Sequence, residues 1–297
     1  MKKSFFVSFV SMLGSLFFLG CIVSVGVVLG VLVYFGRDLP DYRQLEKYEP
    51  LMTTRLYAND GQLLAEYASE RRVFVPVSAI PKQVIHAFLS AEDKNFYSHG
   101  GLDFQGILRA VITNIKNYGK KGNLVGASTI TQQVAKNFLL SSEQSYTRKI
   151  KEALLARRIE QTFDKDHILE LYLNQIFLGL RSYGVAAASL AYFDKSMDEL
   201  ELHEVALLAG LPKGPSAYNP KRNPAGALER RNYVLDRMFI NGYITQQEML
   251  EAKEKPIVLK EREMGKAVQN AQQAARLCNL LIAINYTHSR FLVKIML

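Results

Sequence analysis

The chain has few residues of the kinds that build disulfide frameworks or metal centres. Among 297 residues it has two cysteines, Cys21 in an apolar run and Cys278 near the C-terminus, which excludes a disulfide framework for the region between them. Its five histidines show no metal-ligand spacing such as HExxH. Zinc-finger spacings and RNA-binding signatures are also absent. These absences exclude several common classes of site but leave the redox compartment open.

Charge is missing from the N-terminal run, where no charged side chain occurs from Ser4 to Tyr34. At roughly 20 residues per bilayer crossing this run predicts a membrane anchor, and it is longer than the apolar region of a cleavable signal peptide. Lys2 and Lys3 precede it, and charges of mixed sign follow it. The positive-inside rule therefore predicts a single-pass protein with a cytoplasmic N-terminus and everything after about residue 37 outside the membrane.

The rest of the chain is basic and can bury one sizeable core. The net charge of +9 calls for an anionic partner. Because an exported domain rarely meets nucleic acid, we expect an anionic membrane surface or a phosphorylated substrate and no nucleic acid.

The hydrophobic patterns predict a mainly α fold with a small β region. Residues 53–57, 62–67 and 72–75 alternate as strands do, around a turn at 59–61, and predict a linker sheet near the membrane. Strands are nearly absent beyond residue 80. Helical periodicity predicts helices over residues 82–92, 104–117, 128–139, 147–162, 166–175, 182–192, 198–209, 224–241 and 245–252.

These patterns divide the chain into four predicted parts. They are an N-terminus with its anchor (1–37), a membrane-proximal linker (38–80), a helical domain (81–255) and an atypical tail (256–297). From Gly265 the composition shifts to a Gln- and Ala-rich stretch and then to an apolar stretch without helix caps. Truncation or a frame change is one hypothesis for that tail.

One segment, residues 126–137, gathers hydroxyls, amides and a cation into a turn followed by a helix, GASTITQQVAKN. Ser128 and Thr129 can leave backbone amide donors at the helix start, where anions bind, and Lys136 adds a charge suited to phosphate. A helix start rich in Ser and Thr is ordinarily just a cap. Here Gln133 continues the polar run beyond one turn, which favours a site for a polar, anionic ligand.

A pair of carboxylates ends the predicted helix 82–92. Glu92 and Asp93 open the run EDKNFYSHGGLD, in which Phe96 and His99 follow. Apolar walls can raise the pKa of a carboxylate at such a junction and make it a general acid or base. Acidic pairs are also surface residues by default, so the residues alone leave both interpretations open.

Two further segments carry polar groups on predicted helices. In RKIKEALLARRIE, Arg148 and Lys149 precede Glu152 by four and three residues, so the three side chains share one face. A solvated helix with weak intrahelical ion pairs is the alternative. The later segment ILELYLNQIFLG is mainly scaffold, with Asn174 expected to hold hydrogen bonds in a cleft.

Residues 104–121 predict a basic amphipathic helix followed by a loop around Gly119 and Gly122. Ordinary core packing and a position among lipid headgroups both fit its pattern.

These motifs, in this order, resemble glycosyltransferase family 51, the peptidoglycan polymerase module of class A penicillin-binding proteins and monofunctional transglycosylases. The resemblance covers about residues 40–255 and is carried by EDKNFYSHGG, GASTITQQVAKN, RKIKEALLARRIE and ILELYLNQIFLG, followed by ALLAGLPKGPSAYNP. It implies a lysozyme-like helical domain on the outer face of the cytoplasmic (inner) membrane, acting on lipid II. The nascent glycan strand, membrane lipids and other cell-wall synthesis proteins are the further partners it suggests.

The resemblance also implies roles for individual residues. Glu92 matches the base that deprotonates the acceptor sugar, with inversion at the donor's anomeric carbon, and Glu152 matches a second essential carboxylate. The matching positions expected to bind substrate are Asp93, Phe96, His99, Ser128, Thr129, Gln133, Lys136, Asn137, Arg148, Lys149 and Asn174. The basic helix at 104–121 resembles the membrane-facing lid for the lipid tail, which favours the headgroup position.

Glu152 has three roles open to it: orienting the basic residues, assisting departure of the leaving group, or binding a divalent cation such as Mg²⁺ or Mn²⁺. No organic cofactor is expected.

Two other functions remain open. A lysozyme-like hydrolase would use similar carboxylates to cleave peptidoglycan. An inactive anchored scaffold becomes more attractive if the tail reflects a broken gene. The chain has no Ser-x-x-Lys and no Lys-Thr-Gly sequence, so we expect no covalent reaction with penicillin and hypothesise a fragment or a reduced form.

Overall fold

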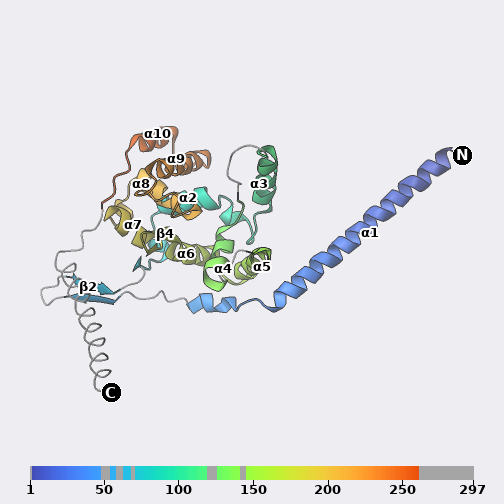
Figure 1. The fold of residues 1–297 in the computed structure, drawn as a ribbon, viewed down its shortest axis with the longest axis horizontal. Coiled ribbons are helices and arrows are strands. Elements are labelled where there is room, and N and C mark those ends of the chain that lie inside the picture. The colour runs from blue at the N-terminus through green and yellow to red at the C-terminus, as the bar shows by residue number, and fades with distance from the viewer. Residues whose placement is uncertain are drawn as a thin grey trace, which may run out of the picture. The chain divides into compact units, whose positions relative to one another are not determined.

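The computed structural model describes residues 2–47, 54–57, 63–67, 71–118, 126–140 and 145–260. Its contacts group the chain into two compact units, which are described separately: unit 1 comprises residues 1–48 and 95–172, and unit 2 comprises residues 49–94 and 173–297. Figure 1 labels their helices and some of their strands. The predicted turn at 59–61, the loop around Gly119 and Gly122, and the tail from residue 261 lie outside the described residues.

The described residues of unit 1 form helices joined by loops, with no strand among them. Its helices are α1 (Lys2–Arg37), α3 (Phe104–Lys116), α4 (Ile130–Leu139), α5 (Tyr146–Thr162) and α6 (Lys165–Gln175), with short 3₁₀ helices at Tyr42–Lys47 and Phe96–Ser98. The last residues of α6, from Leu173, belong to unit 2. Helices α4 and α5 pack together, and both contact the 3₁₀ helix at Tyr42–Lys47.

The N-terminal helix has the composition of a membrane span. Among the described residues, Gly14–Arg37 is the one helical segment long and apolar enough to cross a bilayer, with a mean hydropathy of 2.8 in its most apolar window. Its end lies against α5, where Arg158 Nη2 donates to the Gly36 carbonyl at 3.3 Å. The predicted apolar helix is therefore present.

Unit 2 combines a helical core with two small sheets. Its helices are α2 (Lys82–Glu92), α7 (Val185–Phe193), α8 (Leu202–Gly210), α9 (Pro224–Ile240) and α10 (Gln246–Glu254), with 3₁₀ helices at Val77–Ala79, Met197–Glu199 and Leu211–Lys213. Its strands are β1 (Thr54–Tyr57), β2 (Leu63–Tyr67), β3 (Arg71–Arg72), β4 (Phe177–Gly179) and β5 (Ser182–Tyr183).

The core of unit 2 forms where α2, α8 and α9 pack on one another (Figure 1). Apolar residues three or four positions apart supply one buried face of α2, including Val84 and Phe88, and one of α9, including Val234 and Met238. Helix α8 is buried almost all round. Each large apolar side chain buried here stabilises the fold by about 1.5–3 kcal/mol. Because α2 contributes such side chains along its length, its C-terminal end is held firmly against α8 and α9.

The prediction of a mainly helical chain is confirmed. Seven of the nine predicted helices agree with the structure to within two residues at each end; they are α2, α3, α4, α5, α6, α9 and α10.

The predicted three-stranded linker sheet is wrong in its third strand. Strands β1 and β2 pair antiparallel as expected, but β3 spans only Arg71–Arg72 and pairs in parallel with β5. Strand pairing stops there because the Asn174 side chain takes both backbone groups of Val75: the Val75 N–H donates to Asn174 Oδ1, and Asn174 Nδ2 donates to the Val75 carbonyl, both at 2.8 Å.

Two predicted helices begin later than expected. The predicted helix 182–192 starts at Val185, because Leu180 and Arg181 (φ 49° and 59°) close a hairpin that places β5 first. The predicted helix 198–209 is broken into a 3₁₀ turn and α8. Glu204 accepts from the Glu201 N–H at 2.8 Å and so starts a new helix within the expected one.

Candidate active site

A charged cluster lies at the start of α5. Arg148 Nε lies 3.1 Å from one oxygen of Glu152, and Lys149 Nζ lies 2.5 Å from the other. The side chain of Glu152 is 1% exposed, whereas that of Lys149 is 50% exposed. Ser145 caps the helix by accepting from the Arg148 N–H at 3.1 Å. The prediction that the three charged side chains share a face is confirmed.

This cluster carries a net positive charge. Two cations and one carboxylate stand in the first turns of a helix, whose exposed N–H groups already favour an anion. Glu152 compensates part of the charge and holds the cations in place, while half of the Lys149 side chain remains open to solvent. The arrangement suits a phosphate or diphosphate group, which accepts several charge-assisted hydrogen bonds.

The turn before α4 joins the same cluster, because Lys149 Nζ donates to Ser128 Oγ at 2.9 Å. Thr129 is the N-cap of α4. Its hydroxyl accepts from the Gln132 N–H at 3.2 Å, and the Gln132 side chain accepts from the Thr129 N–H at 3.0 Å. This capping box uses the N–H groups of Thr129 and Gln132, so these two donors are not available to an anion, and binding of an anion at this helix start stays a prediction. Ser128 and Lys149 present the polar groups of the turn instead.

Three further predicted residues follow on α4. Gln133, Lys136 and Asn137 are half-buried. Positions three and four apart lie on one face of a helix, so the three side chains form a row. Their role in binding substrate stays a prediction.

The turn at 95–101 is locked onto α5. Gly101 has a φ of 98°, and a Cβ built there would lie 2.8 Å from the Ala156 carbonyl oxygen, so only glycine fits. His99 Nδ1 accepts from the Gly101 N–H at 3.1 Å, and the Thr129 hydroxyl donates to the Gly101 carbonyl at 2.7 Å. Phe96 is fully buried. His99, Phe96 and Thr129 thus shape the turn, and their contact with a substrate stays a prediction.

Lys165, the first residue of α6, contacts this turn and was not among the predicted site residues. Its Nζ donates to the His99 carbonyl and to Glu160 Oε1, both at 2.7 Å, and lies 4.4 Å from the centre of the Phe96 ring. A lysine in the first turn of a helix opposes the helix dipole, so its position in α6 signals that it needs a carboxylate or carbonyl partner.

Glu92 and Asp93 end α2 in unit 2. Glu92 is the last helical residue, with a side chain 13% exposed, and its Oε1 lies 3.7 Å from Arg230 Nη2. Asp93 is buried, and its N–H donates to the Leu89 carbonyl at 2.9 Å. Arg230 was not among the predicted site residues. It is recognised as a candidate site residue only because the fold brings it close to Glu92. Because Glu92 and Glu152 belong to different units, a cleft shared by the two stays a prediction.

Asn174 also belongs to unit 2 and anchors the segment before α2. Its side-chain amide makes the two hydrogen bonds with Val75 described above, and Asn174 is 6% exposed. A role in substrate binding stays a prediction.

The surroundings of Glu152 do not fit a divalent cation. Both of its carboxylate oxygens face cations, and no group of three or more His, Cys, Asp or Glu side chains able to hold a metal occurs within the described ranges. A metal ion bound to Glu152 would displace Arg148 and Lys149 or lie against their charges.

An apolar groove adjoins the cluster in unit 1. It measures about 1100 Å³ and runs between the start of α3 and α5, with Leu102, Phe104, Ile150 and Leu154 in its walls and Lys149 at its polar side. Such a groove can hold an apolar chain while the cation holds its charged end.

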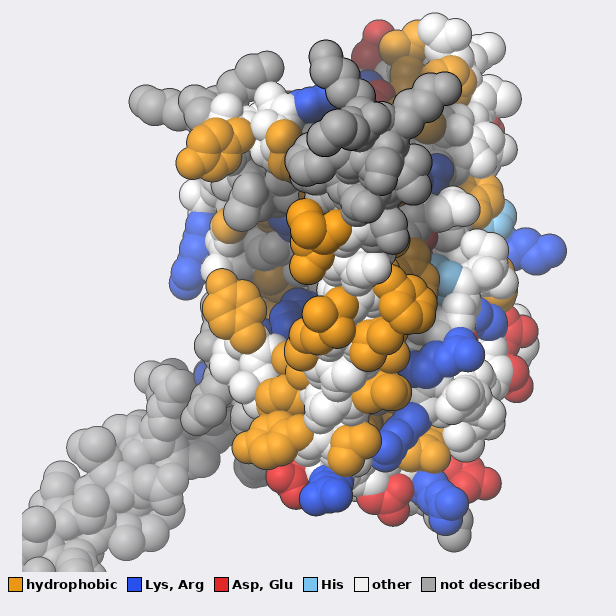
Figure 2. All heavy atoms as spheres, turned by 90° about the vertical axis from the view of Figure 1, so that its right-hand side faces the viewer, with side chains coloured by type: hydrophobic (Ala, Val, Ile, Leu, Met, Phe, Trp, Pro, Cys, Tyr) orange, Lys and Arg blue, Asp and Glu red, His pale blue; other side chains and the backbone are white. Residues whose placement is uncertain are grey.

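Helix α3 carries an outward apolar face. Phe104, Leu108 and Ile115 are 74%, 62% and 68% exposed. Figure 2 shows hydrophobic side chains gathered on the face that carries this helix, with Lys and Arg side chains beside them. Patches of this kind on a soluble protein are uncommon and mark a binding surface.

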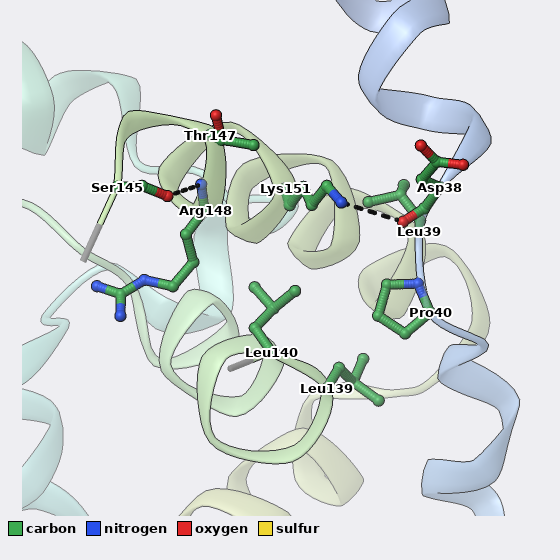
Figure 3. A pocket seen from close by; sticks show the side chains of 9 residues that line it. All are labelled: Asp38, Leu39, Pro40, Leu139, Leu140, Ser145, Thr147, Arg148 and Lys151. Atoms are coloured by element: carbon green, nitrogen blue, oxygen red, sulfur yellow. Dashed lines mark hydrogen bonds between the residues drawn. The ribbon is translucent and has the colours of Figure 1, made fainter. Parts of the chain in front are cut away.

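A second, smaller pocket lies where the chain leaves α1. It measures about 480 Å³ and is lined by Leu39, Pro40 and Leu139 together with Arg148 and Lys151. In Figure 3 the guanidinium of Arg148 points away from Asp38, whereas Lys151 Nζ reaches the Asp38 carbonyl at 3.3 Å. Lys151 therefore helps attach the end of the apolar helix to α5.

Comparison with known proteins identifies relatives over most of the chain. The family model described as Transglycosylase matches residues 60–239. The chain is 52% identical over 255 residues to penicillin-binding protein 1A of Rickettsia felis, covering 86% of this chain and 32% of that protein. It is 47% identical over 248 residues to penicillin-binding protein 1A of Aquifex aeolicus, covering 82% and 34%.

A solved structure is also similar. The crystal structure of penicillin-binding protein 1A from Haemophilus influenzae matches with a TM-score of 0.43 and 31% identity, covering 73% of this chain and 22% of that one. The chain spans about a third of the length of the curated relatives it matches.

Proposed function

Because the chain belongs to the transglycosylase family, glycosyltransferase family 51, we propose that it is a peptidoglycan glycosyltransferase that polymerises lipid II. The observation that carries this proposal is the cluster of Arg148 and Lys149 on Glu152, joined to Ser128. It provides what a diphosphate leaving group needs at the moment its bond breaks.

The cations of α5 act on the leaving group. In the transfer, the bond between the donor's anomeric carbon and the diphosphate oxygen breaks, and the electron pair stays with the diphosphate. Arg148 and Lys149 stabilise the charge that develops there, together with Lys136 of α4. Because Glu152 already holds the two α5 cations in place, little reorganisation accompanies the reaction.

Glu92 is the proposed base. It accepts the proton of the acceptor sugar's 4-hydroxyl while that oxygen forms the new bond to the anomeric carbon, with inversion. The leaving group departs as an anion and needs no strong acid. Glu92 suits this role because it lies at the end of a buried helix whose position the core of unit 2 fixes.

Glu152 is proposed to act through its cations. Of the roles that the sequence left open, orientation of Arg148 and Lys149 fits the contacts, since each of its oxygens faces one of them. No step is assigned to a divalent cation, because the donor set does not fit one.

The apolar groove and α3 are proposed to serve the lipid part of the substrate. The exposed face of α3 and the groove beside Lys149 together offer apolar surface next to a cation. With α1 as a single-pass anchor and its N-terminus in the cytoplasm, α3 would lie among the headgroups of the outer leaflet. The nascent glycan strand and other cell-wall synthesis proteins are further proposed partners.

Polymerisation from labelled lipid II tests this function. The full chain in detergent or vesicles should yield glycan strands, and the phosphoglycolipid moenomycin should abolish them. Purified sacculi should stay intact in the same preparation. Release of soluble fragments from sacculi without any product from lipid II would instead support a hydrolase, and no reaction in either assay would support an inactive scaffold.

A further inference from the structure

The carboxylate of Glu92 stands where a helix disfavours negative charge. It belongs to the last residue of α2, next to carbonyl groups that carry the negative end of the helix dipole. Its side chain is also 87% removed from solvent, since 13% is exposed. An ionised carboxylate in this position needs a nearby cation.

Arg230 of α9 supplies that cation. Its Nη2 lies 3.7 Å from Glu92 Oε1, and its own side chain is 12% exposed. The separation exceeds the length of a hydrogen bond but lies within the range of an ion pair. Arg230 therefore acts on this oxygen through its charge.

The guanidinium of Arg230 is held from three sides. Its Nε donates to the Gly210 carbonyl at the end of α8 at 3.2 Å. The guanidinium carbon lies 4.5 Å from the ring centre of Tyr233 and 6.0 Å from that of Tyr218. A Cβ at Gly210 would lie 3.0 Å from Arg230 Cγ, so the glycine leaves room for the arginine stem. These contacts restrict the arginine before any substrate arrives.

Several other charged groups of α8 and α9 have partners of their own. Arg231 is fully buried and donates to the carbonyls of Lys253 at 2.7 Å and Lys255 at 2.5 Å. Further along α9, Asp236 pairs with Lys253; on α8, Glu204 pairs with Lys195 and His203 lies 3.7 Å from Glu201. On α2 itself, His86 stacks on Tyr243. On α9, Arg230 is the residue whose guanidinium lies beside the Glu92 carboxylate.

We propose that Arg230 is a positioning residue for Glu92, which keeps the carboxylate ionised and oriented to accept the proton of the acceptor hydroxyl. This inference rests on the proposed function, in which Glu92 is the base. It assigns to α9 a part in the reaction beyond its place in the core.

The test compares Arg230→Gln and Arg230→Lys with wild type in the lipid II polymerisation assay of the full chain. Arg230→Gln should lower kcat by about tenfold to a hundredfold while KM for lipid II changes by no more than about twofold, because the ground-state contacts remain. The acid side of its kcat/KM profile should move to higher pH, since a missing cation makes a carboxylate easier to protonate. Arg230→Lys keeps the charge, so it should recover at least about half of the lost activity on a logarithmic scale and the wild-type pH profile.

Arg237→Gln is the matched control. Arg237 lies two turns further along α9, and no ion pair is recorded for it within the described parts of the chain. Its kinetics should equal those of wild type. Thermal unfolding of each variant separates loss of fold from loss of function. If Arg230→Gln does not fold, a folded Arg230→Lys that loses activity without a change in KM while keeping its positive charge would overturn the inference.

The outcomes are distinct. Equal losses in both Arg230 variants with an unmoved acid limb would overturn the inference and leave the proposed function standing. A wild-type protein that makes no glycan from lipid II would overturn both.

Discussion

The two central glutamates have opposite surroundings. Glu152 in unit 1 is 1% exposed and has one cation of its own helix on each oxygen, at 3.1 and 2.5 Å. Glu92 in unit 2 is 13% exposed, and its recorded ion pair is to a cation of another helix at 3.7 Å. Glu152 faces two cations at close range, whereas the cation beside Glu92 lies farther away. The difference supports the proposal that Glu92 accepts the proton and that Glu152 holds the cations, in the way that paired carboxylates divide acid and base roles elsewhere.

The largest effect is expected for Glu92→Gln. Removing a general base lowers the rate by about 10³-fold, which corresponds to about 4 kcal/mol of transition-state stabilisation. The variant should keep its melting temperature and its binding of lipid II, because Gln preserves the size of the side chain. Single-turnover glycan synthesis and calorimetry measure the two properties separately. Retention of more than about a tenth of the wild-type rate would break the assignment of the base.

Glu152→Gln should damage both stability and activity. It leaves the Arg148 and Lys149 charges without their buried partner, so we expect a loss of about 2 kcal/mol of stability and about 10²-fold in rate. Urea unfolding and the polymerisation assay measure these losses. A variant that is as stable as wild type would show that Glu152 does not hold the cations.

Lys149→Gln tests the Glu152 cluster by removing one of its cations instead of its carboxylate. The substitution removes both the ion pair to Glu152 and the hydrogen bond to Ser128. Because half of the Lys149 side chain is exposed, stability should change little, whereas kcat/KM for lipid II should fall about tenfold and depend less steeply on salt. Lys253→Gln, in unit 2 and paired with Asp236, is the control expected to keep wild-type kinetics. An unchanged salt dependence would remove Lys149 from the diphosphate site.

The smallest effect concerns a third carboxylate, Asp103, which caps α3 by accepting from the Gly106 N–H at 2.9 Å. Burial raises its pKa, but this bond and the Asn95 amide at 3.0 Å lower it, and the net pKa lies below the usual range. A carboxyl group with a lowered folded-state pKa stabilises the protein above its unfolded pKa, and that stability is lost as the pH falls through the folded pKa.

Asp103→Ala should therefore cost about 1 kcal/mol at neutral pH and nothing below the folded-state pKa, as measured by chemical unfolding across acidic pH. A cost that stays constant over this range would show that the lost cap is not electrostatic. Glycan synthesis should be affected less than by Glu92→Gln or Glu152→Gln, which makes Asp103 the reference for a carboxylate with a structural role.

Local signals in the sequence predict much of this molecule. The helix bounds, the cap at Thr129 and the shared face of Arg148, Lys149 and Glu152 all depend on residues within one or two turns of each other. The early end of the third strand does not, because it depends on Asn174 meeting Val75 across about 100 residues of sequence.

Separation along the sequence is also the reason that two residues of the candidate site could not be predicted. Lys165 reaches His99, and Arg230 reaches Glu92, through packing that no short motif specifies. Charges placed against a helix dipole, as for Lys165 at the start of α6 and Glu92 at the end of α2, are the signal that a distant partner is required. At such positions the sequence predicts that a partner residue exists, but it does not identify that residue.

The pH dependence of kcat/KM for Glu152→Gln, compared with wild type, tests the division of roles most directly. If Glu92 takes the proton and Glu152 acts through its cations, the variant is slower at every pH and keeps the acid limb where wild type has it. If the acid limb disappears in Glu152→Gln while it persists in Glu92→Gln, the proton acceptor is Glu152, and the roles assigned to the two glutamates are reversed.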